Sequence, residues 1–205
     1  MISYDHNIIF VHIPKCAGSS IESFFIKNSK TACDLVPDCE VSADWCDFKL
    51  PCEGPQHYTI STIRSILCSR NQQNLYDEMF KFAVVRNPWS RMVSESIYLS
   101  NTFKADYDIK TLCKMDYVGN HRFDINQIDF ISINNNIEMD YVVKFENLNQ
   151  SLDLLAGRLS VDNVKLPHTN KSNHKHYTEY YDDETKQMVA ERYAKDIEYF
   201  GYEFE

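Results

Sequence analysis

The sequence lacks any apolar run that approaches the ~18 residues needed to cross a membrane. It also lacks, near its start, the apolar segment and small-residue cleavage site of a secretory signal. Both absences predict a chain that folds in water, and we expect a cytoplasmic location. The 205 residues, 43% of them hydrophobic, suit one globular domain over 1–205 with a full-sized core.

Positive charge is scarce as well. Lys and Arg together number 21, against 30 Asp and Glu, which leaves a net charge of -9. Nucleic-acid binding depends on many phosphate contacts made by clustered Lys and Arg, so this balance argues against such a partner. A small anionic ligand can still bind where a few cations are local.

No cysteine pair has the CxxC spacing that a zinc site favours. Four of the seven cysteines lie in a polar stretch over 30–56 that has prolines and no sustained period, so we expect an irregular excursion there. These four are Cys33, Cys39, Cys46 and Cys52. An odd total favours reduced thiols, with a disulfide among the four as the open alternative, and we expect no metal.

The stretch IIFVHIPKCAGSSIESFFIK, residues 8–27, has the pattern of a buried strand, a small-residue turn and an amphipathic helix that begins near Ser19 or Ser20. The N–H groups at such a helix start, with Lys15 beside them, predict a site for a phosphate or a sulfate. The alternative is an ordinary strand-to-helix turn with a surface lysine.

The stretch VVRNPWSRMVSESIY, residues 84–98, repeats this layout. A buried-strand pattern over 80–85 leads to Arg86, and Pro88 is typical of the first position of a helix. Arg86 and Ser94, about two helical turns further on, predict a second anion site, because a guanidinium binds phosphate with two hydrogen bonds. The alternative is that Arg86 pairs with Glu146.

The remaining patterns complete an alternation of strands and helices. We expect helices over 59–68, 124–131, 148–159 and 182–200, a strand over 141–145, and a long loop or lid that shapes the acceptor site over 101–123. The fold class is therefore α/β, with a central parallel sheet flanked by helices and ligands at the carboxyl ends of the strands.

FVHIPKCAGSS together with FAVVRNPWSRMVS resembles the two donor-binding motifs of the sulfotransferases that use 3′-phosphoadenosine 5′-phosphosulfate (PAPS). The likeness is to the carbohydrate group, which includes heparan 2-O-sulfotransferases and many small bacterial enzymes. It continues through QHYTISTIR, DINQIDFI, VVKFENL and the stretch from NKSNHKHYTEYYDDET to FGYEF, in the family's order. The resemblance implies a P-loop-like three-layer fold and transfer of a sulfuryl group to a hydroxyl, most plausibly of a saccharide.

The resemblance also implies roles for particular residues. The loop around the 5′-phosphosulfate would consist of Lys15, Cys16, Ala17, Gly18, Ser19 and Ser20. Cys16 stands where the family often has threonine, so a hydroxyl contact is lost or replaced by backbone contacts. Arg86 and Ser94 would hold the 3′-phosphate, and Lys171 and Ser172 resemble a late loop that closes over the nucleotide. Lys15 would also neutralise charge on the departing nucleotide, 3′-phosphoadenosine 5′-phosphate (PAP). No metal would be required.

His57 is the candidate general base, because a histidine before the corresponding helix has that role in the resembling family. The alternative is that His57 only packs or caps at a helix start. Two rival functions remain. A small-molecule P-loop kinase would need GxxxxGK[ST] and Mg²⁺, whereas here Lys15 precedes Gly18 and that string is absent. A catalytically silent nucleotide- or glycan-binding relative would keep the fold without turnover.

Overall fold

A computed structural model of the chain describes residues 1–28, 57–118, 121–122, 125–151 and 175–205. The excursion predicted over 30–56, with its four cysteines, lies outside the described residues. So do Lys171 and Ser172. The helix predicted over 148–159 is described only as far as residue 151, and those residues are helical.

A four-stranded sheet forms the centre of the molecule. Its strands are β1 (Ile2–Ser3), β2 (Ile8–Val11), β3 (Phe80–Val85) and β8 (Tyr141–Lys144), in the order β1-β2-β3-β8. β2, β3 and β8 run parallel, while β1 is an antiparallel edge strand. The α/β prediction is confirmed, with β1 as an addition that is too short to show a sequence pattern. β2 is buried along its whole length, as its run of apolar residues predicts.

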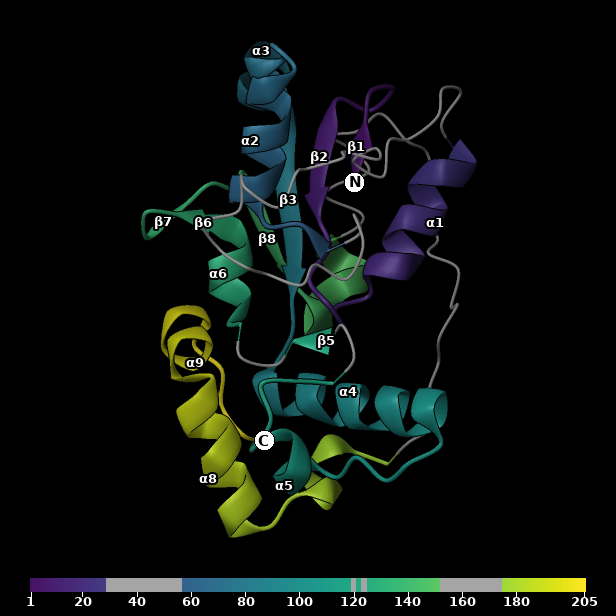
Figure 1. Cartoon of the computed structure of the whole chain (residues 1–205), viewed down its shortest axis with the longest axis vertical. Helices are drawn as coiled ribbons and strands as arrows, with labels where there is room; N and C mark the ends of the chain where they lie inside the picture. Colours follow the sequence, from purple (N-terminus) through teal and green to yellow (C-terminus); the bar gives the residue numbers. More distant parts are fainter. Residues whose placement is uncertain (29–56, 119–120, 123–124, 152–174) are drawn as a thin grey trace.

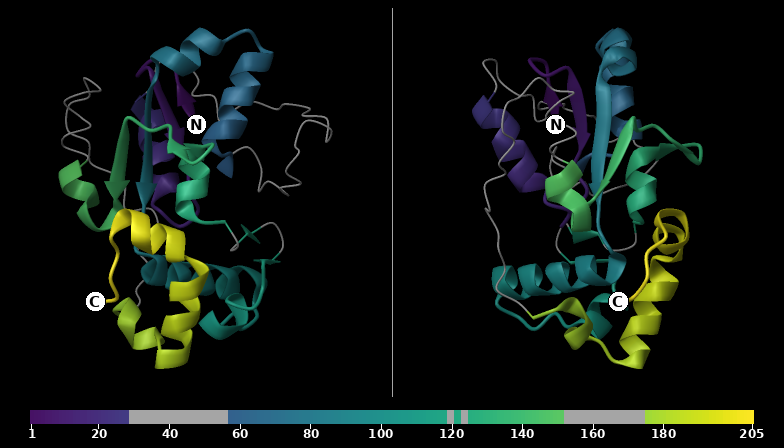
Figure 2. Two further views of the ribbon diagram at one scale, coloured as in Figure 1. Left: turned by 90° about the vertical axis from the view of Figure 1, so that its left-hand side faces the viewer. Right: turned by 180° about the vertical axis from the view of Figure 1, so that it is seen from behind.

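Helices cover both faces of this sheet. α1 (Gly18–Asn28) lies on one side, and α2 (Ile60–Ser69) and α6 (Gln127–Ile131) lie on the other (Figures 1 and 2). The core includes Phe10 and Phe82 from neighbouring strands, whose ring centres are 4.9 Å apart. The sheet is therefore the buried middle layer of the upper part of the molecule in Figure 1.

A second group of helices lies beyond the carboxyl ends of the parallel strands (Figure 1). α4 (Pro88–Phe103) runs across these ends, and α5 (Ile109–Leu112), η4 (Tyr177–Tyr180) and α8 (Asp183–Arg192) pack against it or near it. The remaining elements are α3 (Gln73–Glu78), β4 (Tyr117–Val118), β5 (His121–Arg122), β6 (Ser132–Ile133), β7 (Asn136–Ile137), η3 (Phe145–Asn147) and α9 (Ala194–Phe200). The loops after β2, β3 and β8 therefore meet the helices of this second group.

Local capping explains where several helices begin and end. Asn87 accepts hydrogen bonds from the N–H groups at positions 89 and 90, and Pro88 is the first residue of α4, as predicted. Asp182 forms a capping box with Thr185 at the start of α8. Gly201 ends α9 in the left-handed conformation, with φ 61°. These boundaries agree with the predicted ends of the C-terminal helical segment.

The prediction of one helix over 182–200 is wrong in its middle. α8 ends at Arg192 and α9 starts at Ala194, because Tyr193 leaves helical geometry at φ -112° and ψ 31°. The Tyr193 ring is buried, and the guanidinium carbon of Arg91 lies 5.6 Å from its centre. Neither a proline nor a glycine marks the break, so the sequence pattern did not reveal it.

The loop predicted over 101–123 contains more regular structure than expected. α4 continues to Phe103, α5 occupies Ile109–Leu112, and β4 pairs with β5. α5 forms because Asp108 caps it through the N–H of Thr111 (2.6 Å) and because its two ends are buried. A single helical turn is too short to show a period.

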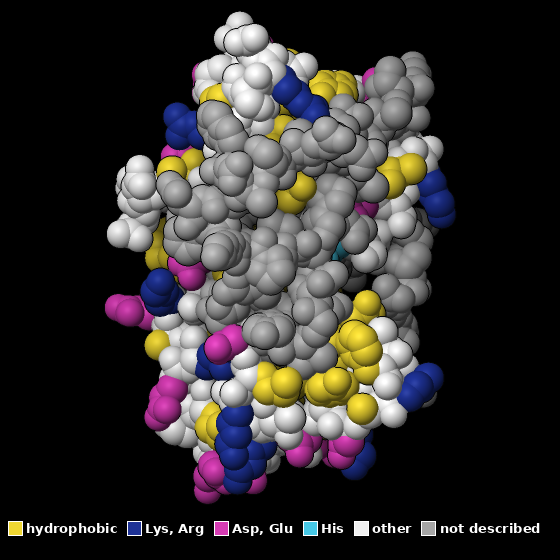
Figure 3. Space-filling model, in the orientation of Figure 1, with side chains coloured by type: hydrophobic (Ala, Val, Ile, Leu, Met, Phe, Trp, Pro, Cys, Tyr) yellow, Lys and Arg dark blue, Asp and Glu magenta, His cyan; other side chains and the backbone are white. Residues whose placement is uncertain are grey.

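No helix among the described residues is long and apolar enough to cross a membrane. On the face shown in Figure 3, positive side chains are scattered, and hydrophobic side chains gather over the part of the molecule that holds α4. Tyr98 and Phe103, both on α4, are among the exposed aromatic residues.

Candidate functional site

The loop between β2 and α1 has a strained backbone. Lys15 and Ala17 have φ angles of 65° and 63°, in the left-handed region that residues with a Cβ atom rarely adopt. Each such residue costs about 1–2 kcal/mol relative to the right-handed conformation. Strain of this kind persists only where surrounding contacts impose it, and it is concentrated at ligand sites.

Two arginines hold this loop from the side of α4. Arg91 donates from Nε to the carbonyl oxygen of Pro14, and Arg86 donates from Nη1 to that of Lys15, both at 3.2 Å. The N–H groups of Gly18 and Ser19 belong to the first turn of α1, which offers them no acceptor. With the positive end of the helix dipole and Lys15, they give the loop the polarity of an anion site.

Arg86 is a nearly enclosed cation, only 8% exposed. Its Nε donates to Ser90 Oγ at 3.0 Å, and its guanidinium carbon lies 4.4 Å from the centre of the Phe145 ring. Burial lowers the pKa of Arg86, because the charged group has lost hydration. Across the part of the chain that the structure describes, no carboxylate lies within ion-pairing distance of it. Glu146 accepts instead from the N–H of Asn87 at 2.8 Å. A bound anion would therefore stabilise Arg86.

One face of α4 borders the loop. Ser90, Ser94 and Tyr98 recur at every fourth position, so they share that face. Ser90 contacts Arg86 at one end, and Lys15 Nζ lies 3.8 Å from the centre of the Tyr98 ring at the other. The half-buried Ser94 is placed between them by this spacing. Ser90 and Tyr98 were not among the predicted site residues, although the four-residue spacing from Arg86 could have identified both.

His57 lies beside the carboxyl end of β2. Its Nδ1 is 3.0 Å from the carbonyl oxygen of His12, and the two rings meet edge to face with centres 4.4 Å apart. A carbonyl oxygen only accepts hydrogen bonds, so Nδ1 carries the proton. In the neutral ring the lone pair is then on Nε2, which is the tautomer that a general base at that atom requires.

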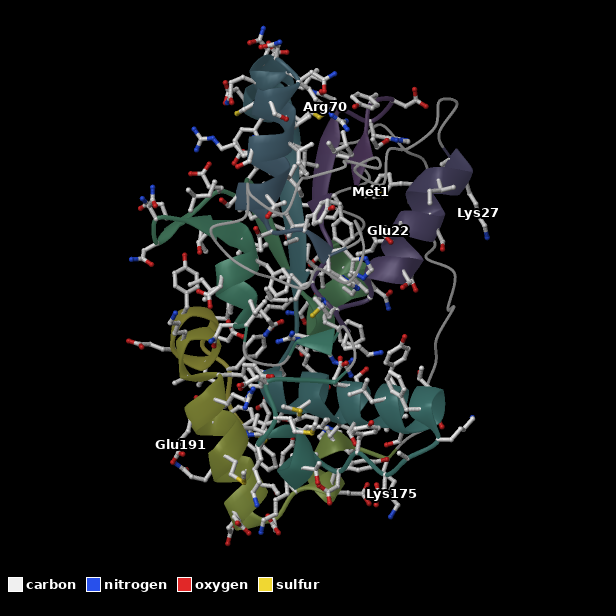
Figure 4. All side chains as sticks on the ribbon, viewed as in Figure 1. Met1, Glu22, Lys27, Arg70, Lys175 and Glu191 are labelled. Carbon is white, nitrogen blue, oxygen red and sulfur yellow. The ribbon has the colours of Figure 1, made fainter. Side chains whose placement is uncertain are left out.

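His12 is fixed by two neighbours from α1. Its Nδ1 lies 3.0 Å from Glu22 Oε1, and both side chains are buried. Figure 4 shows Glu22 pointing from α1 toward the sheet. A Cβ atom placed on Gly18 would lie 1.9 Å from the His12 ring, so only glycine lets α1 begin at this distance from the ring. The start of α1, His12 and His57 therefore form one packed unit.

Residues 1–99 match the model of a family described as the Sulfotransferase family. That range contains the loop after β2, His57, Arg86 and Ser94. This N-terminal part of the chain is similar to the sulfotransferase family. The match supports sulfuryl transfer as the general class of reaction. No curated protein and no solved structure was found to match the chain.

Cys16, in the loop after β2, faces the core. Its Sγ lies 3.3 Å from Gln127 Oε1, and its N–H donates to the carbonyl oxygen of Ile13 at 3.3 Å. Burial raises the pKa of the Cys16 thiol to about 12, so the side chain is neutral at neutral pH. These contacts shape the loop. The expected contact between the Cys16 position and the sulfate-donating nucleotide stays a prediction.

The structure brings Lys15 and Arg86 into direct contact and places His57 against the same strand end that leads into the loop. Arg91 and Gln127, which also hold this region, were not among the predicted residues. Among the described residues, no group of three or more His, Cys, Asp or Glu side chains could hold a metal ion.

Proposed function

We propose that the protein is a sulfotransferase that transfers a sulfuryl group from PAPS to a hydroxyl of a carbohydrate. The observation that carries the proposal is the 3.2 Å hydrogen bond from Arg86 Nη1 to the carbonyl oxygen of Lys15. It joins two anion-binding elements that follow separate strands, β2 and β3. PAPS carries anionic groups at two ends, and a pair of adjacent anion sites suits such a nucleotide.

The residues around the loop fit the donor. Lys15 and the backbone from Ala17 to Ser20 would hold the 5′-phosphosulfate at the start of α1. Arg86 and Ser94 would hold the 3′-phosphate, because the buried guanidinium has no carboxylate partner among the described residues. When bound, PAPS would supply the activated sulfuryl group.

The chain's own groups would contribute positioning, charge neutralisation and proton transfer. Lys15 would offset negative charge that develops on the leaving phosphate. His57 would take the proton of the acceptor hydroxyl at Nε2, a step that typically contributes ~10²–10⁴-fold to a rate. Its Nδ1 contact with the carbonyl of His12 holds the ring in the tautomer needed for that step.

The carbohydrate acceptor and the likeness to heparan 2-O-sulfotransferases rest on the sequence resemblance. One structural feature agrees with a sugar acceptor. Phe103 is exposed, and its ring lies 6.1 Å from that of Tyr107, in the segment 101–123 that we assign to the acceptor side. Aromatic rings offer apolar faces with defined geometry, which suits the faces of sugar rings.

Calorimetric titration with PAP tests the donor site. Arg86→Ala is expected to weaken PAP binding at least tenfold, because it removes the cation and its planar pair of donors. Arg70→Ala is the matched control, since it removes one positive charge at the end of the molecule opposite α4 (Figure 4). Equal affinity of Arg86→Ala and the parent chain would refute the site.

Transfer of radiolabelled sulfate from PAPS to an array of saccharides tests the reaction. His57→Ala should lower turnover by ~10²-fold or more with PAP affinity retained. His176→Ala, on an exposed side chain, is the control. Turnover that chelator abolishes would favour a kinase-like metal mechanism. PAP binding without sulfate transfer to any acceptor would favour the alternative of a catalytically silent nucleotide- or glycan-binding protein.

A further inference from the structure

The side chain of Gln127 pairs with both backbone groups of Arg86. The N–H of Arg86 donates to Gln127 Oε1 at 2.8 Å, and Gln127 Nε2 donates to the carbonyl oxygen of Arg86 at 2.8 Å. Gln127 is completely buried. A primary amide makes the same two hydrogen bonds that a neighbouring strand would make, so Gln127 extends the sheet pairing of β3 by one residue.

Asp196 of α9 holds Gln127 in turn. Asp196 Oδ2 accepts from the backbone N–H of Gln127 at 2.8 Å and from its Nε2 at 3.2 Å. Asp196 Oδ1 accepts from the N–H of Ile128 at 3.0 Å. Asp196 is also completely buried, and burial raises the pKa of its carboxyl. These contacts explain why α6 begins at Gln127 rather than at the predicted 124, since its cap comes from another helix.

The result is a chain of buried hydrogen bonds from α9 to the arginine of the donor site. Arg86 is held at its backbone by Gln127 and at its side chain by Ser90 and the carbonyl of Lys15. An arginine side chain loses about 2 kcal/mol of rotamer freedom when it is fixed, and binding is tighter where the fold has already fixed it. A shift of the Arg86 backbone would also move the carbonyl contact that supports Lys15.

We propose that Gln127 and Asp196 are positioning residues for the donor site: they hold Arg86 at the end of β3 in the geometry that binds the ribose phosphate of the nucleotide. The inference rests on the proposed function. It means that residues beyond 1–99, in α6 and α9, complete a site whose binding groups lie within the family match.

Gln127→Met tests this, because methionine has a similar length and cannot pair with the Arg86 backbone. We expect PAP affinity to fall at least tenfold. The matched control is Asp140→Ala at the other end of β3, where Asp140 Oδ2 accepts from the N–H of Lys81 at 2.7 Å. It removes a side-chain contact to the backbone of the same strand, so it should lower stability while PAP affinity stays within about twofold of the parent.

Circular dichroism and thermal denaturation establish that each variant is folded. If Gln127→Met does not fold, Gln127→Glu takes its place, since it keeps the acceptor for the Arg86 N–H but loses the donor to the Arg86 carbonyl. The same fall in PAP affinity, at least tenfold, is then expected of Gln127→Glu. In the unaltered chain, PAP should slow amide hydrogen exchange around both Arg86 and Gln127.

The two proposals fail differently. If the parent chain does not bind PAP, the proposed function is wrong. If the parent binds PAP and the Gln127 variants bind it equally well, the positioning role is wrong while the donor site stands. Protection from exchange at Arg86 but not at Gln127 would also overturn the positioning role.

Discussion

Gly18→Ala should damage both stability and the site, through a steric mechanism that the structure makes quantitative. The new Cβ atom would lie 1.9, 2.0 and 2.4 Å from three atoms of the His12 ring, whereas Cβ contacts below 3.0 Å essentially do not occur. The ring must retreat by at least about 1 Å in a packed core. It then leaves Glu22 and shifts the edge contact with His57.

The cost follows from two opposing contributions. Overpacking in a core costs about 1–3 kcal/mol, and occasionally more. The better helix propensity of alanine returns up to about 1 kcal/mol. We expect a net loss of about 1–3 kcal/mol in the free energy of unfolding, and each kcal/mol lowers Tm by about 2–4 °C in a chain of this size.

Urea denaturation measures the free energy, and transfer of labelled sulfate measures the effect on His57. Gly201→Ala is the matched control. There a Cβ atom would meet nothing within 4 Å, so only the positive φ of 61° is penalised, at about 1–2 kcal/mol. Gly201→Ala should leave turnover unchanged. If Gly18→Ala is as stable as the parent chain, or has full turnover, the packing argument is wrong.

Three further results are expected. Iodoacetamide at pH 8 should leave Cys16 unlabelled in the folded chain and label it in urea. A pKa of about 12 lowers the thiolate fraction by about a thousandfold relative to an ordinary thiol. Rapid labelling of Cys16 in the native chain would contradict the burial of its side chain. Asp182→Ala should lower Tm at pH 7. Hydrogen bonds from Thr185 lower the pKa of Asp182 below its ordinary 3.8, so its stabilisation is present above that pH and is lost as the pH falls through the lowered value. Melting curves between pH 3 and 7 check that the difference narrows in acid. Glu22→Gln should reduce sulfate transfer and leave the Kd for PAP unchanged, because Glu22 contacts His12 and His12 packs against His57. An unchanged transfer rate would show that Glu22 has no role in the reaction.

The two strand-to-helix units could be predicted from the sequence because their signals are local. β3 covers the predicted residues 80–85, and α4 begins at the predicted Pro88. An apolar run, a helical period and a cap each involve neighbours within one or two turns, and such patterns carry over directly into structure. Lys15 and Arg86 were identified for the same reason, since each follows a recognisable strand.

Other features depended on residues far apart in the chain. Asp196 caps the start of α6 through Gln127 and Ile128, which precede it by 69 and 68 residues in the sequence. Through Gln127 it also holds the backbone of Arg86. The buried Tyr193 divides the C-terminal helix, and no local pattern marks that break. The contact between Arg86 and Lys15 spans 71 residues. The sequence alone determined which segments carry the charged groups, through local periodicity and capping. Only the tertiary structure decided how those groups are held, because buried polar atoms take their partners from wherever the fold brings a donor and an acceptor together.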